Sequence, residues 1–434
     1  MKAAALARYG ALGLPLAFVA LPLYVTLPQF YASLGLPLAL VGAVLLGVRL
    51  LDAFSDPLIG RLCDRLLARS ALAAWRFLLL AAVLLMGGFA GLFQPQVEGV
   101  RALAWWCAST LLLTTLAYSL MSVMHQAWGA RLGAGDALQT RLVAWREGLA
   151  LVGVLTASVL PTLVGLGTTT AVFAVLLTVG ALLLVRGPKP LAGVAIFGAV
   201  ARARLPRHLT SLRLPWSTPG FRSLIAVFLL NGVASAVPAT LVLFFIRDRL
   251  QLPELEALFL GSYFGAAALA LPLWLRVLDR IGLERGWLAG MLLAVLTFAF
   301  ALTLDAGDRN GFWLVCLASG VALGADLAAP GALLTRVITR AGHAQLAEGA
   351  YFGWWNFASK LTLALAAGLA LPLLQALGYA PGQTDAASLR ALSLTYCLLP
   401  CALKLAAAAL LYTFLIRPES LPCPTQLPQP NPAP

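Results

Sequence analysis

Long, uninterrupted apolar runs are the feature that most constrains this chain. Most extend over about 18 residues or more, close to the roughly 20 apolar residues that a transmembrane helix requires. A membrane β-barrel would instead alternate apolar and polar residues over segments of about ten. The sequence therefore predicts an all-α membrane protein with twelve transmembrane helices. They are expected at approximately residues 9–34, 37–60, 77–94, 102–127, 142–165, 168–185, 223–246, 257–275, 286–304, 311–334, 349–378 and 391–416.

The hydrophilic stretches predict how the chain is divided. Hydrophobic residues make up 61% of the 434 and charged residues 11%, which leaves no room for a large soluble domain. The longest hydrophilic stretch, residues 186–222, is rich in arginine and proline and separates a six-helix half, 1–185, from a second, 223–417. Its short apolar part, residues 191–200, is expected to lie at the membrane interface. The proline-rich tail, 418–434, is predicted to be disordered.

The net charge of +13 is unevenly distributed between the two sides of the predicted helices. Most Lys and Arg residues fall in loops on the side of the N-terminus. The opposite side holds Arg101, Arg247, Arg249, Arg309 and Arg390. Because basic residues are retained on the cytoplasmic side, both termini are expected there. Topology thus accounts for the charge without a nucleic-acid partner, and the bias toward Ala, Leu and Arg indicates a bacterial inner membrane.

A short charged signature recurs at matching places in the two halves. After the second run the chain reads GRLCDR at residues 60–65, and after the eighth it reads RVLDRIG at residues 276–282. An Asp-Arg pair in a two-helix turn, repeated six helices later, is typical of a duplicated six-plus-six architecture.

The chain carries no motif that predicts an enzyme. It lacks a glycine-rich phosphate loop followed by Lys and Ser or Thr, and its three histidines are scattered. The six cysteines show no paired metal spacing, so neither a zinc site nor a disulfide is expected. The first apolar run is too long for a signal peptide and is predicted to remain as a helix. No enzymatic activity, cofactor or metal other than a sodium ion is predicted.

Charged residues inside the apolar runs carry the functional argument. An ionised group in hydrocarbon costs several kcal/mol unless it is paired or faces water, so such residues mark functional sites. The acids and bases are equal in number, and their formal charges cancel. They are Asp52, Asp56, Glu147 and Asp326, and Arg49, Arg146, Lys360 and Lys404.

Three of these residues share one helix face. Arg49, Asp52 and Asp56 are spaced i, i+3, i+7. Two carboxylates one turn apart cannot both stay ionised cheaply, so a cation bridges them, one holds a proton, or a base neutralises them. The first two cases make a site for Na⁺ or H⁺, to which Ser55 could add a hydroxyl ligand. The third is a structural Arg-Asp pair that packs helices.

This helix resembles the second helix of the glycoside, pentoside and hexuronide cation symporters, the melibiose-permease branch of the major facilitator superfamily. The specific match is residues 42–60, GAVLLGVRLLDAFSDPLIG. Shorter matches are WREG at 145–148, GADL at 324–327, GAYF at 349–352 and ASK at 358–360. The resemblance extends over the whole chain and implies the major facilitator fold.

The resemblance also implies roles for individual residues. Asp52 and Asp56 would bind the coupling cation, with Arg49 beside them. Arg146 and Lys360 match the arginine and lysine that lie near the substrate and the cation in that family.

The sugar-binding residues of the family are not matched. Its acids on helices one and four fall at Leu16 and Ser122, and neither is a carboxylate. The sugar-stacking tryptophan falls at Gln126, which leaves Trp128, two residues away, as a substitute. Galactoside recognition is therefore not implied, whereas cation coupling is.

Two further acids are candidates for substrate binding or coupling. Glu147 projects about 100° away from Arg146 on a helix and is expected to pair with a base on another span. Asp326 lies four residues before Pro330, which frees a backbone carbonyl that could line a cavity with the carboxylate. For Lys404, near the middle of its run, a buried acid partner and a functional role are both open.

Together these features predict a cation-coupled secondary symporter that moves a small polar solute, such as a sugar or glycoside, by alternating access. The protein is expected to work as a monomer in contact with membrane lipid. A proton-coupled lipid or drug carrier is the alternative within transport. A membrane sensor or scaffold that transports nothing is the alternative from another class.

Overall fold

The computed structural model describes residues 1–133, 135–190, 212–379 and 385–417, and within them the chain is built from helices and connecting turns without a strand. The predicted all-α architecture is confirmed. The interfacial segment expected at 191–200 and the disordered tail expected at 418–434 lie outside the described residues.

The N-terminal helices end before the hydrophilic stretch. The first span is broken into short helices, and α7 runs through two predicted spans. The elements are α1 (Ala3–Gly10), α2 (Gly13–Leu21), a π-helix (Pro22–Thr26), α3 (Leu27–Ser33), α4 (Leu38–Arg69), α5 (Ala71–Phe93), α6 (Val100–Ala130) and α7 (Asp136–Val185). Gly165 has φ +76 inside α7 and kinks it where the two predicted spans meet, a conformation that glycine adopts readily.

The C-terminal helices begin with a short helical turn, and their last span is interrupted by π-helices. The elements are α9 (Leu214–Ser217), α10 (Pro219–Phe244), a π-helix (Phe245–Arg249), a 3₁₀ turn (Pro253–Leu255), α11 (Glu256–Ile281), α12 (Leu283–Ala301), α13 (Arg309–Arg340), α14 (Glu348–Ala376), α15 (Ala386–Ser393), a π-helix (Leu394–Leu398), α16 (Leu399–Leu411) and a last π-helix (Tyr412–Ile416).

Eleven helical segments among the described residues are long and apolar enough to cross a membrane. The exception among the predicted spans is α4, whose 32 residues suffice in length but which carries seven charged residues between Arg49 and Arg69. Several helices continue past the predicted apolar runs, α4 to Arg69 and α13 to Arg340. Hydropathy predicts only the part of a helix that faces hydrocarbon. The same helix can continue into a charged segment that hydropathy does not detect.

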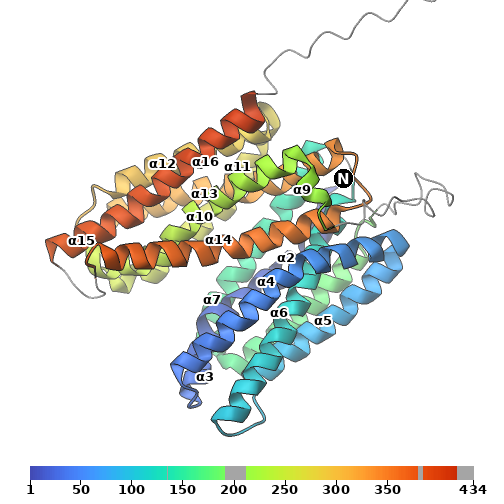
Figure 1. Cartoon of the computed structure of the whole chain (residues 1–434), viewed down its shortest axis with the longest axis horizontal. Coiled ribbons are helices and arrows are strands. Elements are labelled where there is room, and N and C mark those ends of the chain that lie inside the picture. Colours follow the sequence, from blue (N-terminus) through green and yellow to red (C-terminus); the bar gives the residue numbers. More distant parts are fainter. Residues whose placement is uncertain (134, 191–211, 380–384, 418–434) are drawn as a thin grey trace, which may run out of the picture.

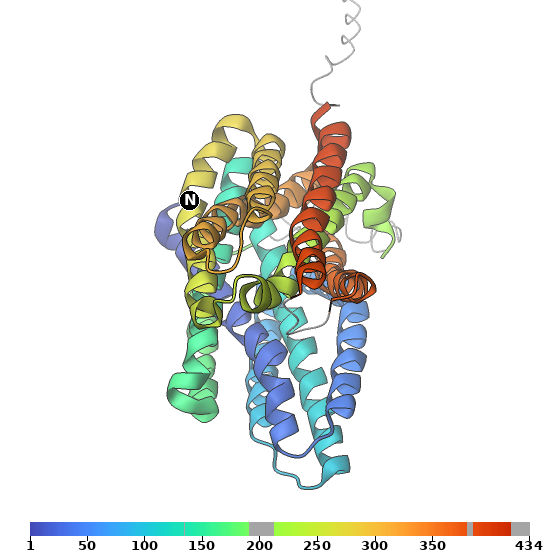
Figure 2. The ribbon, with the colours of Figure 1, turned by 90° about the vertical axis from the view of Figure 1, so that its left-hand side faces the viewer.

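The two groups of helices converge at one end of the molecule and spread apart toward the other. Figure 1 shows them meeting near α9 and the N-terminus and diverging toward α3 and α15, and Figure 2 shows the N-terminal helices below the C-terminal ones. The main contacts between the groups join α4 to α14, α7 to α13 and α11, and α6 to α14.

Glycines let α4 and α14 approach to backbone contact. A Cβ at Gly60 would overlap with the carbonyl oxygen of Gly349, and a Cβ at Gly353 would lie 2.5 Å from the carbonyl oxygen of Asp56. Toward the other end of α4, a Cβ at Gly42 or Gly47 would meet no atom within 4 Å. We call the end of the molecule where the two groups meet the closed end; it includes the contact between residues 56–64 of α4 and residues 348–360 of α14.

Replacing Gly60 by leucine is expected to force the closed end apart. Extra atoms in a tight contact cost about 1–3 kcal/mol, which favours conformations in which α4 and α14 are separated. Spin labels at the exposed Ala68 and Thr339 should then report longer distances in Gly60→Leu. Gly47→Leu, on the same helix but in open space, is the matched control. Unchanged distances in Gly60→Leu would contradict the backbone contact.

Candidate functional site

Two buried acids of α4 share one ammonium group from α14. The Lys360 Nζ lies 2.7 Å from Asp52 Oδ2 and 2.8 Å from Asp56 Oδ2, and it donates a hydrogen bond of 2.9 Å to Asp56 Oδ1. The Asp56 side chain is fully buried and that of Asp52 is 9% exposed. The acids belong to the N-terminal group of helices and the lysine to the C-terminal group, so this ion pair joins the two.

A serine of α6 completes the cluster. Lys360 Nζ also donates to Ser119 Oγ at 2.8 Å, and Ser119 donates to Asp52 Oδ1 at 2.7 Å. The Ser55 hydroxyl, predicted as a cation ligand, instead donates to the backbone oxygen of Asp52 at 2.7 Å. In this conformation the hydroxyl that contacts the carboxylates therefore comes from Ser119, which the sequence does not predict as a ligand.

The cluster lies at the limit of the close contact between α4 and α14, beyond which α4 runs through open space at Gly47 and Gly42. A cavity of about 50 Å³ adjoins it, lined by Arg49, Asp52, Tyr118, Thr115 and Lys360 together with apolar residues of α2, the π-helix that follows it, α4 and α6. Arg49 thus lies beside Asp52 as the i, i+3 spacing predicts. Because Asp52 lines this cavity and Asp56 is fully buried, Asp52 is the more accessible of the two acids.

A second charged network holds the closed end together. The fully buried Arg131, at the end of α6, lies 3.0 Å from Asp64 Oδ1 and 2.8 Å from Glu348 Oε2. Asp64 also accepts hydrogen bonds from the backbone N–H groups of Gly349 at 2.7 Å and Ala350 at 2.8 Å. These amides begin α14, where N–H groups have no partner within the helix and favour an anion. Asp64 belongs to the repeated charged signature, which gives that motif a physical role.

Arg336 makes a parallel connection between the groups. At the end of α13 it donates to Asp136 Oδ2, at the start of α7, at 3.1 Å, and it also pairs with Glu284 of α12. The closed end is therefore fastened at two places by buried or half-buried charge pairs.

Arg146 and Glu147 pair with each other. Arg146 donates to Glu147 Oε1 through Nε at 3.0 Å and through Nη2 at 2.6 Å, so the expectation that Glu147 pairs with a base on another span is wrong. The Cα–Cβ bonds of the two residues point about 100° apart around the helix axis, but the arginine side chain is long enough to bring its guanidinium group to the Glu147 carboxylate.

Gln126 and Trp128 have different surroundings. Gln126 donates to Ser122 Oγ at 3.0 Å and, across to α14, to Asn356 Oδ1 at 3.1 Å. Trp128 is buried, and its indole N–H donates to the backbone oxygen of Pro188 at 3.1 Å. Trp128 thus anchors the chain beyond α7, and its ring is not open to a solute in this conformation.

Asp326 belongs to a separate buried cluster inside the C-terminal group. Its carboxylate accepts hydrogen bonds from Lys404 Nζ at 2.9 Å, Trp287 Nε1 at 2.8 Å and Asn231 Nδ2 at 3.0 Å. Lys404 Nζ also donates to Asn231 Oδ1 at 2.8 Å. These bonds connect α10, α12, α13 and α16, so of the two roles left open for Lys404 the structure provides the buried acid partner.

The sequence predicts the charged residues of the Lys360 and Asp326 clusters, but neither most of their neutral partners nor the buried ion pairs of Arg131 and Arg336. Ser119, Asn231 and Asn356 carry small polar side chains within apolar runs, and Trp287 resembles any buried aromatic residue in sequence. Their common signal is a hydrogen-bonding side chain in a membrane helix, which needs a partner there.

Two helical bundles that meet at one end, with charge pairs buried between them, make up the major facilitator fold. Solved structures share it over nearly the whole chain. A bacterial homologue of the iron transporter ferroportin in an outward-facing state aligns with a TM-score of 0.67 and 18% identity over 95% of this chain and 99% of that chain. The major facilitator transporter FucP in the outward conformation aligns with a TM-score of 0.61 and 12% identity over 93% of this chain and 98% of that chain. The human organic anion transporter MFSD10 (TETRAN) aligns with a TM-score of 0.59 and 15% identity over 95% of this chain and 100% of that chain.

The family follows from the sequence itself. A family model described as MFS/sugar transport protein matches residues 8–417. The chain belongs to this family, the melibiose-permease-like branch of the major facilitator superfamily, so the resemblance carried by residues 42–60 is confirmed and the protein is a membrane transporter. No curated protein sequence matches the chain.

Removing Lys404 alone is expected to destabilise the protein more than removing the whole charge pair. Lys404→Met leaves Asp326 buried without its base, a change that typically costs about 3–5 kcal/mol. Adding Asp326→Asn removes the uncompensated charge and should recover much of the loss. Thermal unfolding of the purified variants in detergent measures the difference. Equal stability of Lys404→Met and the wild type would contradict a structural role for the pair.

Proposed function

We propose that the protein is a cation-coupled symporter in which Asp52 and Asp56 hold the coupling ion. One observation carries this proposal: two carboxylates one helical turn apart, both buried, share a single ammonium group. The two carboxylates face two bases, since Lys360 contacts both and Arg49 lines the cavity beside Asp52. A Na⁺ ion or a proton that binds the carboxylates would take over part of this neutralisation from a base, in a region where an unbalanced charge is costly.

The oxygen atoms around the ammonium suit such an ion. Asp52, Asp56 and Ser119 contribute carboxylate and hydroxyl oxygens, the hard ligands that Na⁺ prefers. A proton would need only one of the carboxylates. Both ions remain compatible with the cluster, as they were from the sequence.

The position of Lys360 supplies a route to coupling. Its ammonium joins the two groups of helices, and a cation that binds the same carboxylates competes with it or redistributes its hydrogen bonds. Binding of the ion thereby changes the contact between α4 and α14, the helices whose glycines form the closed end. A ligand changes a conformational equilibrium only through such unequal interactions with its two states.

A small polar solute is the proposed cargo. Gln126 and Asn356 meet across the two groups near the cluster, and the Arg146–Glu147 pair is only partly buried. These groups offer donors and acceptors for hydroxyl-rich molecules such as sugars or glycosides. The family name points the same way, although the position of the family's helix-one acid is occupied by the buried, apolar Leu16.

The closed end is proposed to face the cytoplasm of a bacterial cell. It carries the charge pairs of Arg131 and Arg336, and the excess of basic residues predicts that side as cytoplasmic. The solute and the cation would then enter from the opposite side and leave after the network at the closed end has separated.

Ion coupling can be tested before the solute is identified. Proteoliposomes adsorbed on a solid-supported membrane are exposed to a jump in Na⁺ concentration or in pH, and the displacement current reports cation binding and movement. Asp52→Asn and Asp56→Asn should each reduce the current by about tenfold or more, because each removes one formal charge from the site. Full currents for both ions in both variants would refute the proposal.

Two serine variants provide a matched comparison. Ser119→Ala removes a hydroxyl that contacts both Lys360 and Asp52, and is expected to weaken the apparent affinity for the ion. Ser55→Ala removes a hydroxyl that contacts only backbone in this conformation, and should leave the affinity nearly unchanged. Equal effects of the two variants would contradict the placement of Ser119 in the site.

A further inference from the structure

The turn between α4 and α5 holds a hollow that differs in chemistry from the site described above. It has a volume of about 480 Å³ and is lined by Arg69, Ser70, Leu72, Arg76, Phe77 and Leu80, with Ala73 at its floor. Arg69 ends α4 and the other residues belong to the turn and the first part of α5. The residues that line it include no acid.

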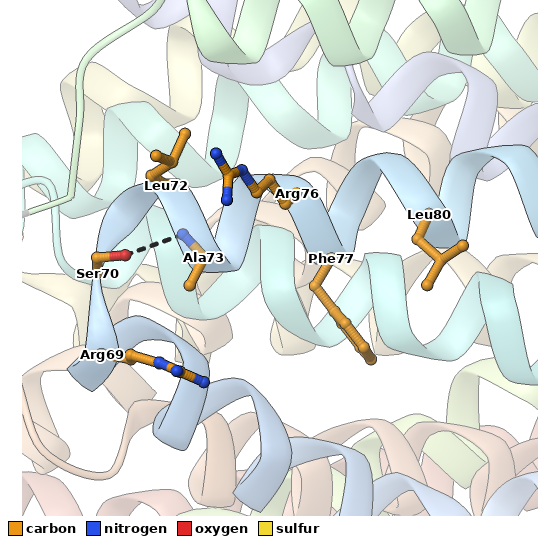
Figure 3. A pocket seen from close by; sticks show the side chains of 7 residues that line it. All are labelled: Arg69, Ser70, Leu72, Ala73, Arg76, Phe77 and Leu80. Carbon is orange, nitrogen blue, oxygen red and sulfur yellow. Dashed lines mark hydrogen bonds between the residues drawn. The ribbon is translucent and has the colours of Figure 1, made fainter.

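The lining changes from charged to apolar along α5. Figure 3 shows both guanidinium groups near the Ser70 end, Arg69 on one side of α5 and Arg76 on the other, with Phe77 and Leu80 farther along the helix. Because α5 is long and apolar enough to cross a membrane and its apolar run begins at Phe77, we expect the charged part to lie at the membrane boundary and the apolar part deeper.

Both arginines are exposed and lack protein partners. Within the described residues, neither Arg69 nor Arg76 makes a hydrogen bond or ion pair, whereas Arg131 and Arg336 at the closed end are engaged with acids. The apolar residues also face outward, with Leu72 53% and Leu80 52% exposed. Topology explains why basic residues occur on this side but not why two of them flank a hollow that continues along an apolar wall.

We propose that this hollow binds an anionic phospholipid of the adjacent leaflet. The guanidinium group of Arg69 or Arg76, whose planar shape matches phosphate oxygens, pairs with the phosphate, and an acyl chain follows Phe77 and Leu80. Basic residues at the membrane surface attract anionic headgroups in this way. A free phosphate ion would use the charged part alone, so the apolar continuation favours a lipid.

Binding is tested by native mass spectrometry of the full chain released from detergent. Phosphatidylglycerol and phosphatidylcholine are added at equal concentrations, and the fraction of protein carrying each is measured. The wild type is expected to retain phosphatidylglycerol and not phosphatidylcholine. Arg69→Gln with Arg76→Gln should weaken phosphatidylglycerol binding about tenfold or more, since each basic residue contributes to attraction of an anionic headgroup.

A matched double variant separates this hollow from general surface charge. Arg276 and Arg280 are also exposed, lie four residues apart at the end of α11, and are expected on the same side of the membrane. Arg276→Gln with Arg280→Gln should bind phosphatidylglycerol as the wild type does. An equal loss in both double variants, or no loss in Arg69→Gln with Arg76→Gln, would overturn the proposal.

The wild type alone separates a lipid from a bare anion. Glycerol 3-phosphate and inorganic phosphate are offered as competitors of phosphatidylglycerol. If these competitors displace phosphatidylglycerol only at concentrations far above its own, the apolar residues Phe77 and Leu80 contribute to binding of the lipid. Equal potency of inorganic phosphate, or equal retention of phosphatidylcholine, would overturn the proposal even if the arginine variants failed to fold.

Discussion

Burying two carboxylates on one membrane helix imposes a condition that much of this structure satisfies. Asp52 and Asp56 need a counter-charge within hydrogen-bonding distance. Their own helix places Arg49 beside Asp52, but the base in direct contact with both acids is Lys360 of α14. That contact requires α4 and α14 to approach closely, which Gly60, Gly349 and Gly353 permit. The electrostatic requirement and the small residues therefore act together, and either alone would be insufficient.

The two buried charge clusters differ in what they connect. Lys404 and Asp326 satisfy each other inside one group of helices, with Trp287 and Asn231 completing the hydrogen bonds. Such a cluster stabilises the packing within the C-terminal group. Lys360 instead crosses between the groups, so its bonds must change whenever the groups move relative to each other. The same chemistry thus joins helices within one group in one place and joins the two groups in the other.

Much of this arrangement could be predicted from the sequence, and the rest depended on distances that a sequence does not contain. The apolar runs predicted the helices, and the cancelling charges showed that buried acids and bases belong together. Which acid meets which base is a property of packing, so Glu147 was given a distant partner although Arg146 lies beside it. Ser55 stood in the right motif, yet its hydroxyl turns to its own backbone and Ser119, 67 positions from Asp52, makes the contact.

The charged character of α4 also bears on how the protein is made. This helix is synthesised early, whereas Lys360 follows it by some 300 positions in the chain. Until α14 is made, Asp52 and Asp56 lack the ammonium group that contacts both of them in the complete chain, and Arg49 of the same helix is the base that lies beside Asp52. The N-terminal helices therefore acquire this ion pair only after the C-terminal helices have been synthesised.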